Sequence, residues 1–222
     1  GVASGMVGAV KRVKLLGTGC EAAGSRRTTK VIKSRLKAFG RQREKYHALR
    51  RNGVDTTAMV QAAGAASMLY GAEMQGVSDS MLQQVRSLAA RAGAPVGAGK
   101  NTDRTLYALD GARGSVDPAF SAHSLPIVAW ATAHWESWYP EVVLEAAFHH
   151  AERKIGELAV PWSYGGPVGG MILTARRLGW DWQSATRLVD DIGHEWDVRL
   201  DPPAALRKAV MQSVRRWRLR RI

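Results

Sequence analysis

Apolar and polar residues recur with helical spacing over most of the chain. The clearest case is the stretch 26–51, where basic residues recur every three or four positions and apolar residues share that spacing on roughly the opposite face. The basic positions are Arg26, Lys30, Lys33, Lys37 and Arg41, and the apolar positions are Ile32, Leu36, Phe39 and Tyr46. The pattern predicts one long amphipathic helix. Gly40 is expected to mark a bend or a close backbone approach, and Asn52-Gly53 is expected to end the helix.

The residues on either side of this stretch predict shorter elements. Residues 12–20 favour a short strand, whose glycines loosen the backbone for a turn. Asp55 or Thr56 is expected to cap a helix over 56–76, whose many Ala and Gly residues suit a buried helix against which others pack closely. A third amphipathic helix begins near Ser78. Three helices joined by short turns predict a helical bundle.

The second half of the chain reads differently. Gly and Pro are dense over 93–117, which predicts a loop-rich link, and helical patterns resume from 118. The segment 186–200 indicates a small β-hairpin that turns at 191–193, where the Asp190-Asp191 pair is expected to be solvated. The sequence therefore predicts a mainly α fold, in which a helical bundle and a second helical subdomain accompany a short N-terminal strand and a small hairpin. The expected divisions are 1–24, 25–92, 93–117 and 118–222.

Positive charge is concentrated in two blocks. The chain carries 32 Lys and Arg against 19 Asp and Glu, and residues 11–51 hold 14 of the basic residues with only two acidic ones. Residues 207–222 hold seven basic residues and no acidic one, whereas residues 52–206 are mildly acidic. Such blocks favour a polyanionic partner, most often nucleic acid, because its condensed counterions are released on binding. The simpler interpretation of the basic helix is a solvated surface.

Several classes of protein do not fit this composition. The single Cys20 excludes a disulfide framework and a cysteine-based zinc site, and it fits a reducing compartment. No apolar run approaches the roughly 20 residues that span a bilayer, and the basic blocks lack the apolar residues needed to insert into a membrane surface. The chain begins without Met, which suggests a piece of a longer product. We expect an intracellular protein, with the nucleus as one candidate compartment.

The sequence offers no recognisable catalytic constellation. A glycine-rich run ends at Lys100, but Ala94 stands where a phosphate-binding loop needs its first Gly, and Asn101 stands where it needs Ser or Thr. His149 and His150 have no partners at the spacing of a metal-ligand set, so no metal site is predicted.

The eight Trp residues allow two interpretations. Core packing is favoured, because a buried indole fills space efficiently. The alternative is base stacking on exposed rings, worth roughly 1–3 kcal/mol per base. Trp217, which lies between Arg216 and Arg218, is the strongest candidate for stacking.

Three segments carry a family resemblance, namely VKLLGTGCEAAG, TTKVIKSRLKAFGRQREKYHALRRNGVD and ASMLYGAEMQGVSDSMLQQVR. In order and spacing they resemble the region just after the palm in non-LTR retrotransposon reverse transcriptases. There a strand with a K-x-LG core ends the palm, a basic thumb helix follows, and a YG-[AS]-E-like piece leads into a capped helix. The matching parts are 13–17, 30–51 and 70–73. The later segment GPVGGMILTARRLGWDW also looks like the C-terminal region of retroelement-derived open reading frames.

The resemblance implies a thumb-like bundle over 25–92 and a primer-grip-like segment at Lys14, Leu15, Leu16 and Gly17. It also implies that the palm is missing, because no Y-x-D-D-type pair of metal-binding aspartates occurs in the chain. No catalytic residue, metal ligand or cofactor is therefore assigned here, and Mg²⁺ is expected only in the missing palm. The expected partners are RNA or an RNA–DNA hybrid, and the upstream palm and fingers of the same polypeptide, with no membrane.

Two function hypotheses from different classes follow, with a remnant lacking any activity as a third. The first is a fragment of an RNA-directed DNA polymerase, inactive alone, that grips template and primer by their phosphates. Its candidate contacts are Arg26, Arg27, Lys30, Lys33, Lys37, Arg41, Lys45, Arg51, Arg215, Arg216, Trp217, Arg218 and Arg220. The alternative is a non-enzymatic helical interaction module that docks an acidic protein or a neighbouring domain.

Overall fold

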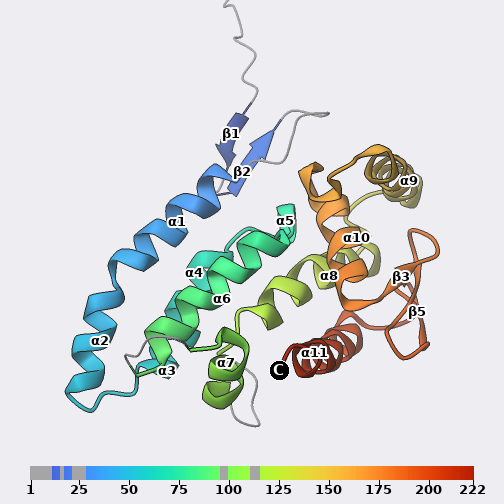
Figure 1. Ribbon diagram of the computed structural model, residues 1–222. Coiled ribbons are helices and arrows are strands. Elements are labelled where there is room, and N and C mark those ends of the chain that lie inside the picture. Colours follow the sequence, from blue (N-terminus) through green and yellow to red (C-terminus); the bar gives the residue numbers. More distant parts are fainter. Residues whose placement is uncertain (1–11, 16–17, 22–28, 96–99, 111–115) are drawn as a thin grey trace, which may run out of the picture.

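The computed structural model describes residues 12–15, 18–21, 29–95, 100–110 and 116–222. The fold is mainly α with a small antiparallel sheet, as the sequence predicts (Figure 1). The helices are α1 (Lys30–Arg41), α2 (Arg43–Arg51), α3 (Thr56–Met59), η1 (Val60–Ala65), α4 (Ala66–Leu69), α5 (Ala72–Gln75), α6 (Asp79–Gly93), α7 (Thr102–Asp110), α8 (Ala119–Trp135), α9 (Glu141–Glu157), η2 (Pro161–Ser163), α10 (Pro167–Leu178) and α11 (Pro203–Leu219). The strands are β1 (Arg12–Leu15), β2 (Thr18–Glu21), β3 (Asp181–Trp182), β4 (Arg187–Val189) and β5 (Glu195–Asp197).

The basic stretch forms two helices rather than the single one predicted. α1 and α2 meet at Gln42, whose backbone N–H donates to the carbonyl of Phe39 over 2.9 Å and so tightens the turn. Gly40, two residues before the break, weakens the helix at this point because glycine lacks helix propensity. Gly53 then takes a left-handed φ of +80° and ends α2, as predicted. The two helices form one edge of the molecule (Figure 1).

The predicted apolar face of the basic stretch is buried. Leu36, Phe39 and Tyr46 lie in the core and Ile32 packs against it. The Phe39 ring lies over Gly64, where an added Cβ would come within 2.7 Å of Phe39 Cε2. The apolar face of the basic stretch thus packs on the Ala-rich segment at a position where only glycine leaves room.

The Ala-rich segment is less regular than the predicted helix over 56–76. Asp55 caps its start by accepting the N–H of Thr57 over 2.9 Å. A π-helical stretch, η1, then separates α3 from α4, and Tyr70 ends α4. Gly71, with φ +82°, starts the short α5. Only one side of this segment is buried, so it is a half-buried helix rather than the fully buried one expected.

Two long helices organise the core. α6 packs against α1, α2, α3, α7 and α8, while α8 packs against α5, α10 and α11. Both contribute buried apolar residues to one continuous cluster. No helix in the described residues combines the length and the apolar character needed to cross a bilayer.

The predicted boundary segment 93–117 contains a helix instead of loop alone. α7 lies within it and packs against α6 through Leu106, which is fully buried. The core cluster continues past this segment, from Leu36 in α1 to Val214 in α11. Gly and Pro residues at both ends of the segment hid the short helical pattern between them.

The small β elements differ in number from those predicted. The hairpin expected over 186–200 is confirmed as β4 and β5, with Leu188 opposite Trp196 and Gly193 at φ +85° in the turn. β3 adds a third antiparallel strand beside β4. The single strand expected over 12–20 is instead an antiparallel pair, in which β1 and β2 are joined through residues outside the described ones.

α5 and α10 touch backbone to backbone. A Cβ on Gly170 would lie 2.5 Å from the amide nitrogen of Gly76 and 2.7 Å from the carbonyl carbon of Gln75. Gly76 itself has φ +59°, which favours glycine. Glycine is therefore required on both sides of this contact.

The Gly170→Ala variant should be destabilised by about 1–3 kcal/mol, because the added methyl group meets backbone that cannot turn aside. Gly156→Ala is the matched control. Gly156 also lies in a helix, but nothing lies within 4 Å of its added Cβ. Its replacement should stabilise the protein by up to about 1 kcal/mol. Urea denaturation of the three proteins measures both effects, and equal stability of the two variants would contradict the packing described.

Candidate nucleic-acid interface

Six basic side chains form an exposed stripe along the outer face of α1 and α2. The stripe consists of Lys30, Lys33, Lys37, Arg41, Lys45 and Arg51. Among the described residues, none of the six takes part in an ion pair or a side-chain hydrogen bond. The two helices together span roughly 30 Å at 1.5 Å per residue. The stripe is therefore a long band of exposed positive charge, in which Lys30, Lys33, Lys37 and Arg41 share one face of α1.

Other arginines of the same two helices point to the protein instead. Arg35 stacks its guanidinium over the Tyr70 ring, 5.0 Å from the centroid, and donates to the Tyr70 carbonyl. Arg50 donates to Thr56 Oγ1 over 3.1 Å and to the carbonyl of Gly93. These contacts fix α1 and α2 on the bundle, so the stripe is held on a rigid support.

The stripe has an electrostatic cost in the free protein. Lys33 and Lys37, and Lys37 and Arg41, are like charges four residues apart, and such a pair destabilises a helix by about 0.2–0.5 kcal/mol. The one acidic residue of these two helices, Glu44, pairs with Arg43 at 3.0 Å and offsets only Arg51 of the stripe through a longer-range attraction. A bound polyanion would remove the repulsion, and this favours a phosphate-bearing partner.

Six residues predicted to bind nucleic acid or to resemble the primer grip belong to the N-terminal part of the chain. Lys14 and Leu15 lie in β1. Leu16, Gly17, Arg26 and Arg27 lie outside the described residues.

In the C-terminal block, Arg216 was also predicted to contact nucleic acid, but it binds an aspartate of the protein. Arg216 donates to both carboxylate oxygens of Asp191, over 2.8 and 2.7 Å. Asp191 also accepts from Trp180 Nε1 over 3.2 Å and from the Ser213 hydroxyl. The hydrogen bond from Arg216 is the main reason that the pKa of Asp191 lies far below its usual value. Arg216 therefore holds α11 against the turn between β4 and β5, and two of its three guanidinium nitrogens are engaged there.

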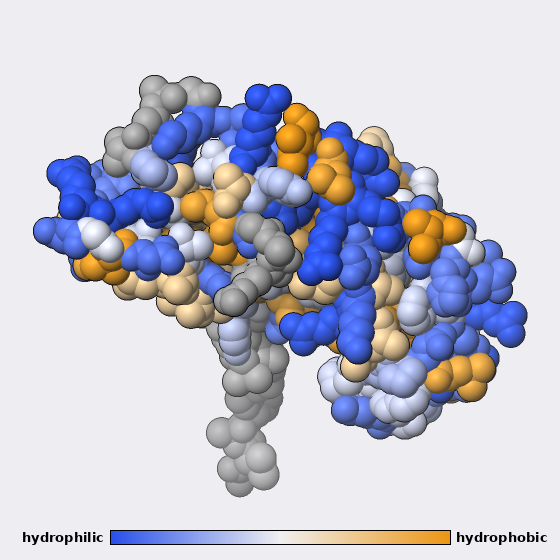
Figure 2. All heavy atoms as spheres, turned by 90° about the horizontal axis from the view of Figure 1, so that it is seen from below, coloured by the Kyte–Doolittle hydropathy of each residue, from blue (hydrophilic) through white to orange (hydrophobic). Residues whose placement is uncertain are grey.

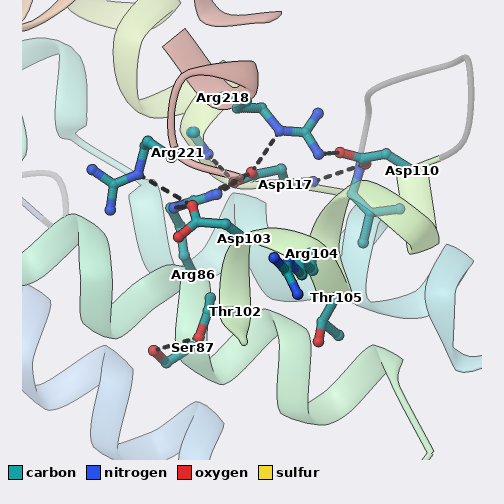
Figure 3. A network of polar contacts seen from close by, with 12 residues as sticks. Arg86, Ser87, Thr102, Asp103, Arg104, Thr105, Asp110, Asp117, Arg218 and Arg221 are labelled. Carbon is teal, nitrogen blue, oxygen red and sulfur yellow. Dashed lines mark hydrogen bonds and ion pairs between the residues drawn. The ribbon is translucent and has the colours of Figure 1, made fainter. Parts of the chain in front are cut away.

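Arg218 is buried in a network of ion pairs (Figure 3). Its Nε lies 3.0 Å from Asp117 Oδ2, and its Nη2 lies 2.5 Å from Asp110 Oδ2 without hydrogen-bond alignment. Arg86 of α6 binds the same Asp117 through Nε and Nη2, at 3.0 and 2.8 Å, and reaches Asp103 at 2.6 Å. Only 5% of Arg218 is exposed, so the prediction that it contacts nucleic acid is wrong.

Trp217 is also committed to the fold. Its ring centroid lies 5.1 Å from that of His123, and the guanidinium carbons of Arg86 and Arg221 lie 5.3 and 4.7 Å from it. The ring packs against the core and lies beside two of the protein's own cations. This arrangement favours the core-packing interpretation of Trp217 over base stacking. The core-packing interpretation also holds for Trp180, of which 1% is exposed.

Only Arg215 and Arg220 remain exposed among the predicted arginines of the C-terminal block. Figure 1 places α6, α7 and α8 between α11 and the pair α1–α2, so the stripe is separated from α11. The face seen from below is mainly hydrophilic, and its apolar residues form small separate groups (Figure 2).

The Asp190-Asp191 pair is not the solvated turn that we predicted. Asp190 is buried and accepts from the N–H groups of Ile192 and His194 and from Trp196 Nε1. Both carboxylates thus stabilise the hairpin and its contact with α11. Among the residues described, no group of three or more His, Cys, Asp and Glu side chains is placed to hold a metal ion.

The ion-pair network escaped sequence analysis. Asp103, Asp110 and Asp117 lie in the segment predicted as a link, and nothing in their spacing pairs them with Arg86, or with Arg218 and Arg221 more than 100 residues away. Burial disfavours the charged form of Asp103, but Arg86 and Arg221 outweigh it and lower its pKa.

Comparison with protein-family models, with curated proteins and with solved structures finds no significant match to this chain.

The Arg218→Met variant should lose about 3–5 kcal/mol of stability, because it leaves Asp110 and Asp117 buried without one of their cations. Arg220→Met removes the same charge two residues away from an exposed position and should stay within about 0.5 kcal/mol of the parent. Chemical denaturation at neutral pH compares the two. A small loss in both variants would mean that the network contributes nothing to stability.

His123 should make the fold sensitive to acid. It is fully buried, and burial is the main cause that lowers its pKa from 6.5 to about 3. Below pH 6.5 the unfolded chain binds a proton at this residue and the folded chain does not, so stability falls as the pH falls toward 3. The slope reaches up to about 1.4 kcal/mol per pH unit. His123→Phe should show a shallower loss of unfolding free energy between pH 6.5 and 4.5, whereas the exposed His150→Gln should follow the parent.

Proposed function

We propose that the stripe on α1 and α2 binds the sugar–phosphate backbone of RNA or an RNA–DNA hybrid. The observation that supports this most is the row of six exposed basic side chains with no partner among the described residues. Protein surfaces usually intersperse charges of both signs, and an unbroken row of one sign attracts an oppositely charged polymer.

The shape and chemistry of the stripe suit a phosphate backbone. Phosphates of one strand follow one another at about 3.4 Å along a duplex axis, so a stripe of roughly 30 Å can contact several of them. Four of the six side chains are lysines, which act as point charges on flexible stems and read no base pattern. The binding should therefore be independent of sequence.

The family resemblance gives this binding a context. Under the proposal, the chain is a non-catalytic part of a reverse transcriptase-like protein, and the stripe takes the place of the thumb helix that grips template and primer. Polymerisation, with its Mg²⁺, would require a palm that this sequence does not contain. The fixed position of α1 and α2 on the bundle suits a grip that positions a duplex rather than a tail that searches for one.

The proposal predicts a steep and local dependence on salt. Each neutralised phosphate contributes about 0.7–0.9 to the slope of log K against log salt concentration. The double variant Lys33→Gln, Lys37→Gln should bind a labelled RNA–DNA hybrid more weakly and with a slope that is smaller by about 1.4–1.8. Fluorescence anisotropy titrations at salt concentrations from about 50 to about 300 mM measure both the affinity and the slope.

The matched control is the double variant Arg207→Gln, Lys208→Gln. It removes the same net charge from exposed positions of α11, away from the stripe. Its slope should remain that of the parent. Equal effects of the two variants would indicate attraction by net charge alone, and a flat salt dependence of the parent would rule out phosphate binding. If the Lys33, Lys37 variant instead lost only a complex with an acidic protein, the stripe would be a protein-docking surface.

A further inference from the structure

A pocket of about 320 Å³ lies between α5, α8, α9 and α10. Its floor is formed by small side chains, Ala129 and Ala133 of α8 and Ala147 of α9. Ala129 and Ala133 are four residues apart and so share one face of α8. The hollow exists because larger side chains are missing at these three positions, where two long helices would otherwise fill the space between them.

Aromatic rings surround this hollow. Trp130 is buried in the wall, while 53% of Trp138 and 59% of Tyr139 is exposed. Trp138 Nε1 donates to Glu136 over 2.7 Å, which satisfies the polar atom of the indole within the protein. The Trp138 ring therefore offers apolar and π surface at the pocket without a demand for a hydrogen bond, and Tyr139 adds a second exposed ring.

One charged group lines the pocket, the carboxylate of Glu73. Glu73 is half-buried and forms no ion pair or hydrogen bond with the described residues. Asp103, Asp191 and Asp197, which are also shielded from water, each pair with an arginine. Glu73 has no such partner, so a cation that entered the pocket would meet a negative charge that no described residue neutralises.

The position of Glu73 is fixed by the backbone around it. It lies in α5, which ends at the close contact between Gly76 and Gly170 of α10. The N–H of Gly166 also lies 3.5 Å from Gln75 Oε1. The backbone that carries Glu73 is thus held in place before any ligand arrives, which supports a specific site.

We propose that this pocket binds a small apolar molecule that carries one protonated amine. The apolar body would fill the hollow against the three alanines, and the ammonium group would pair with Glu73 beside the aromatic rings, which also attract cations. The volume, near the lower end of small-molecule sites, suits a ligand about the size of a single aromatic ring with a short chain. A phosphate-bearing ligand is excluded, because Glu73 would repel it. This site is separate from the stripe on α1 and α2 and does not depend on its function.

Three probes of nearly equal size test the proposal on the unaltered protein. They are phenethylamine, neutral 2-phenylethanol and anionic 3-phenylpropionate. Isothermal titration calorimetry should show phenethylamine binding at least about ten-fold more tightly than the alcohol, with the carboxylate weakest. The indole N–H signals of Trp130 and Trp138 in ¹H–¹⁵N NMR spectra should shift with the amine, which locates the binding in the pocket.

Two variants and a control then assign the roles. Glu73→Gln should reduce the affinity for phenethylamine to that for 2-phenylethanol, and Ala129→Leu should abolish binding of both by filling the hollow. Glu145→Gln removes an exposed carboxylate of α9 that does not line the pocket and should leave both affinities unchanged. Equal affinities of the three probes, absence of binding, or a Glu73→Gln variant that still prefers the amine would each overturn the proposal.

Discussion

The bidentate contact between Arg86 and Asp117 joins the two halves of the molecule. Arg86 is 1% exposed and extends from α6, the helix that supports α1 and α2, to Asp117, two residues before α8. Asp117 also accepts the N–H of Ala119, the first residue of α8, over 2.9 Å. Arg218 of α11 shares the same carboxylate. Because a buried charge without its partner is strongly destabilising, three helices are constrained to meet at one point.

This constraint explains why basic side chains of α11 are paired within the fold, whereas those of the stripe remain exposed on the surface. In α11, Arg216 and Arg218 are paired with aspartates from distant parts of the chain, and their charge stabilises the packing of the last helix. The six residues of the stripe have no ion pair among the described residues, so their charge stays on the surface. Part of the net charge of +13 is therefore neutralised within the fold at α11, whereas the positive charge of the stripe remains available to a partner.

Local features were predictable from the sequence, and long-range pairings were not. The 3.6-residue period identified the face with Leu36 and Phe39, and an Asp before a helix and a Gly after one identified the cap at Asp55 and the stop at Gly53. The same period put Lys33 and Lys37 on the outer face. The period does not show which element covers a given face, so the burial of Arg218 between Asp110 and Asp117 could not be predicted from it. The π-helical stretch at η1 was missed for a related reason, because it has no turn residue to signal it.

One short segment connects the stripe to the pocket. Tyr70 carries the guanidinium of Arg35, which fixes α1, and Glu73 lines the pocket three residues later. Between them, Gly71 takes a left-handed turn, so the chain reverses without a flexible loop. The backbone contact between Gly76 and Gly170 then prevents α5 from moving unless α10 moves with it. The segment is therefore a fixed support that orients both surfaces. Each residue of the order Tyr-Gly-Ala-Glu has a structural role apart from any family resemblance. Tyr70 supplies a ring for Arg35, Gly71 a positive φ, Ala72 a small buried side chain, and Glu73 a carboxylate at the pocket.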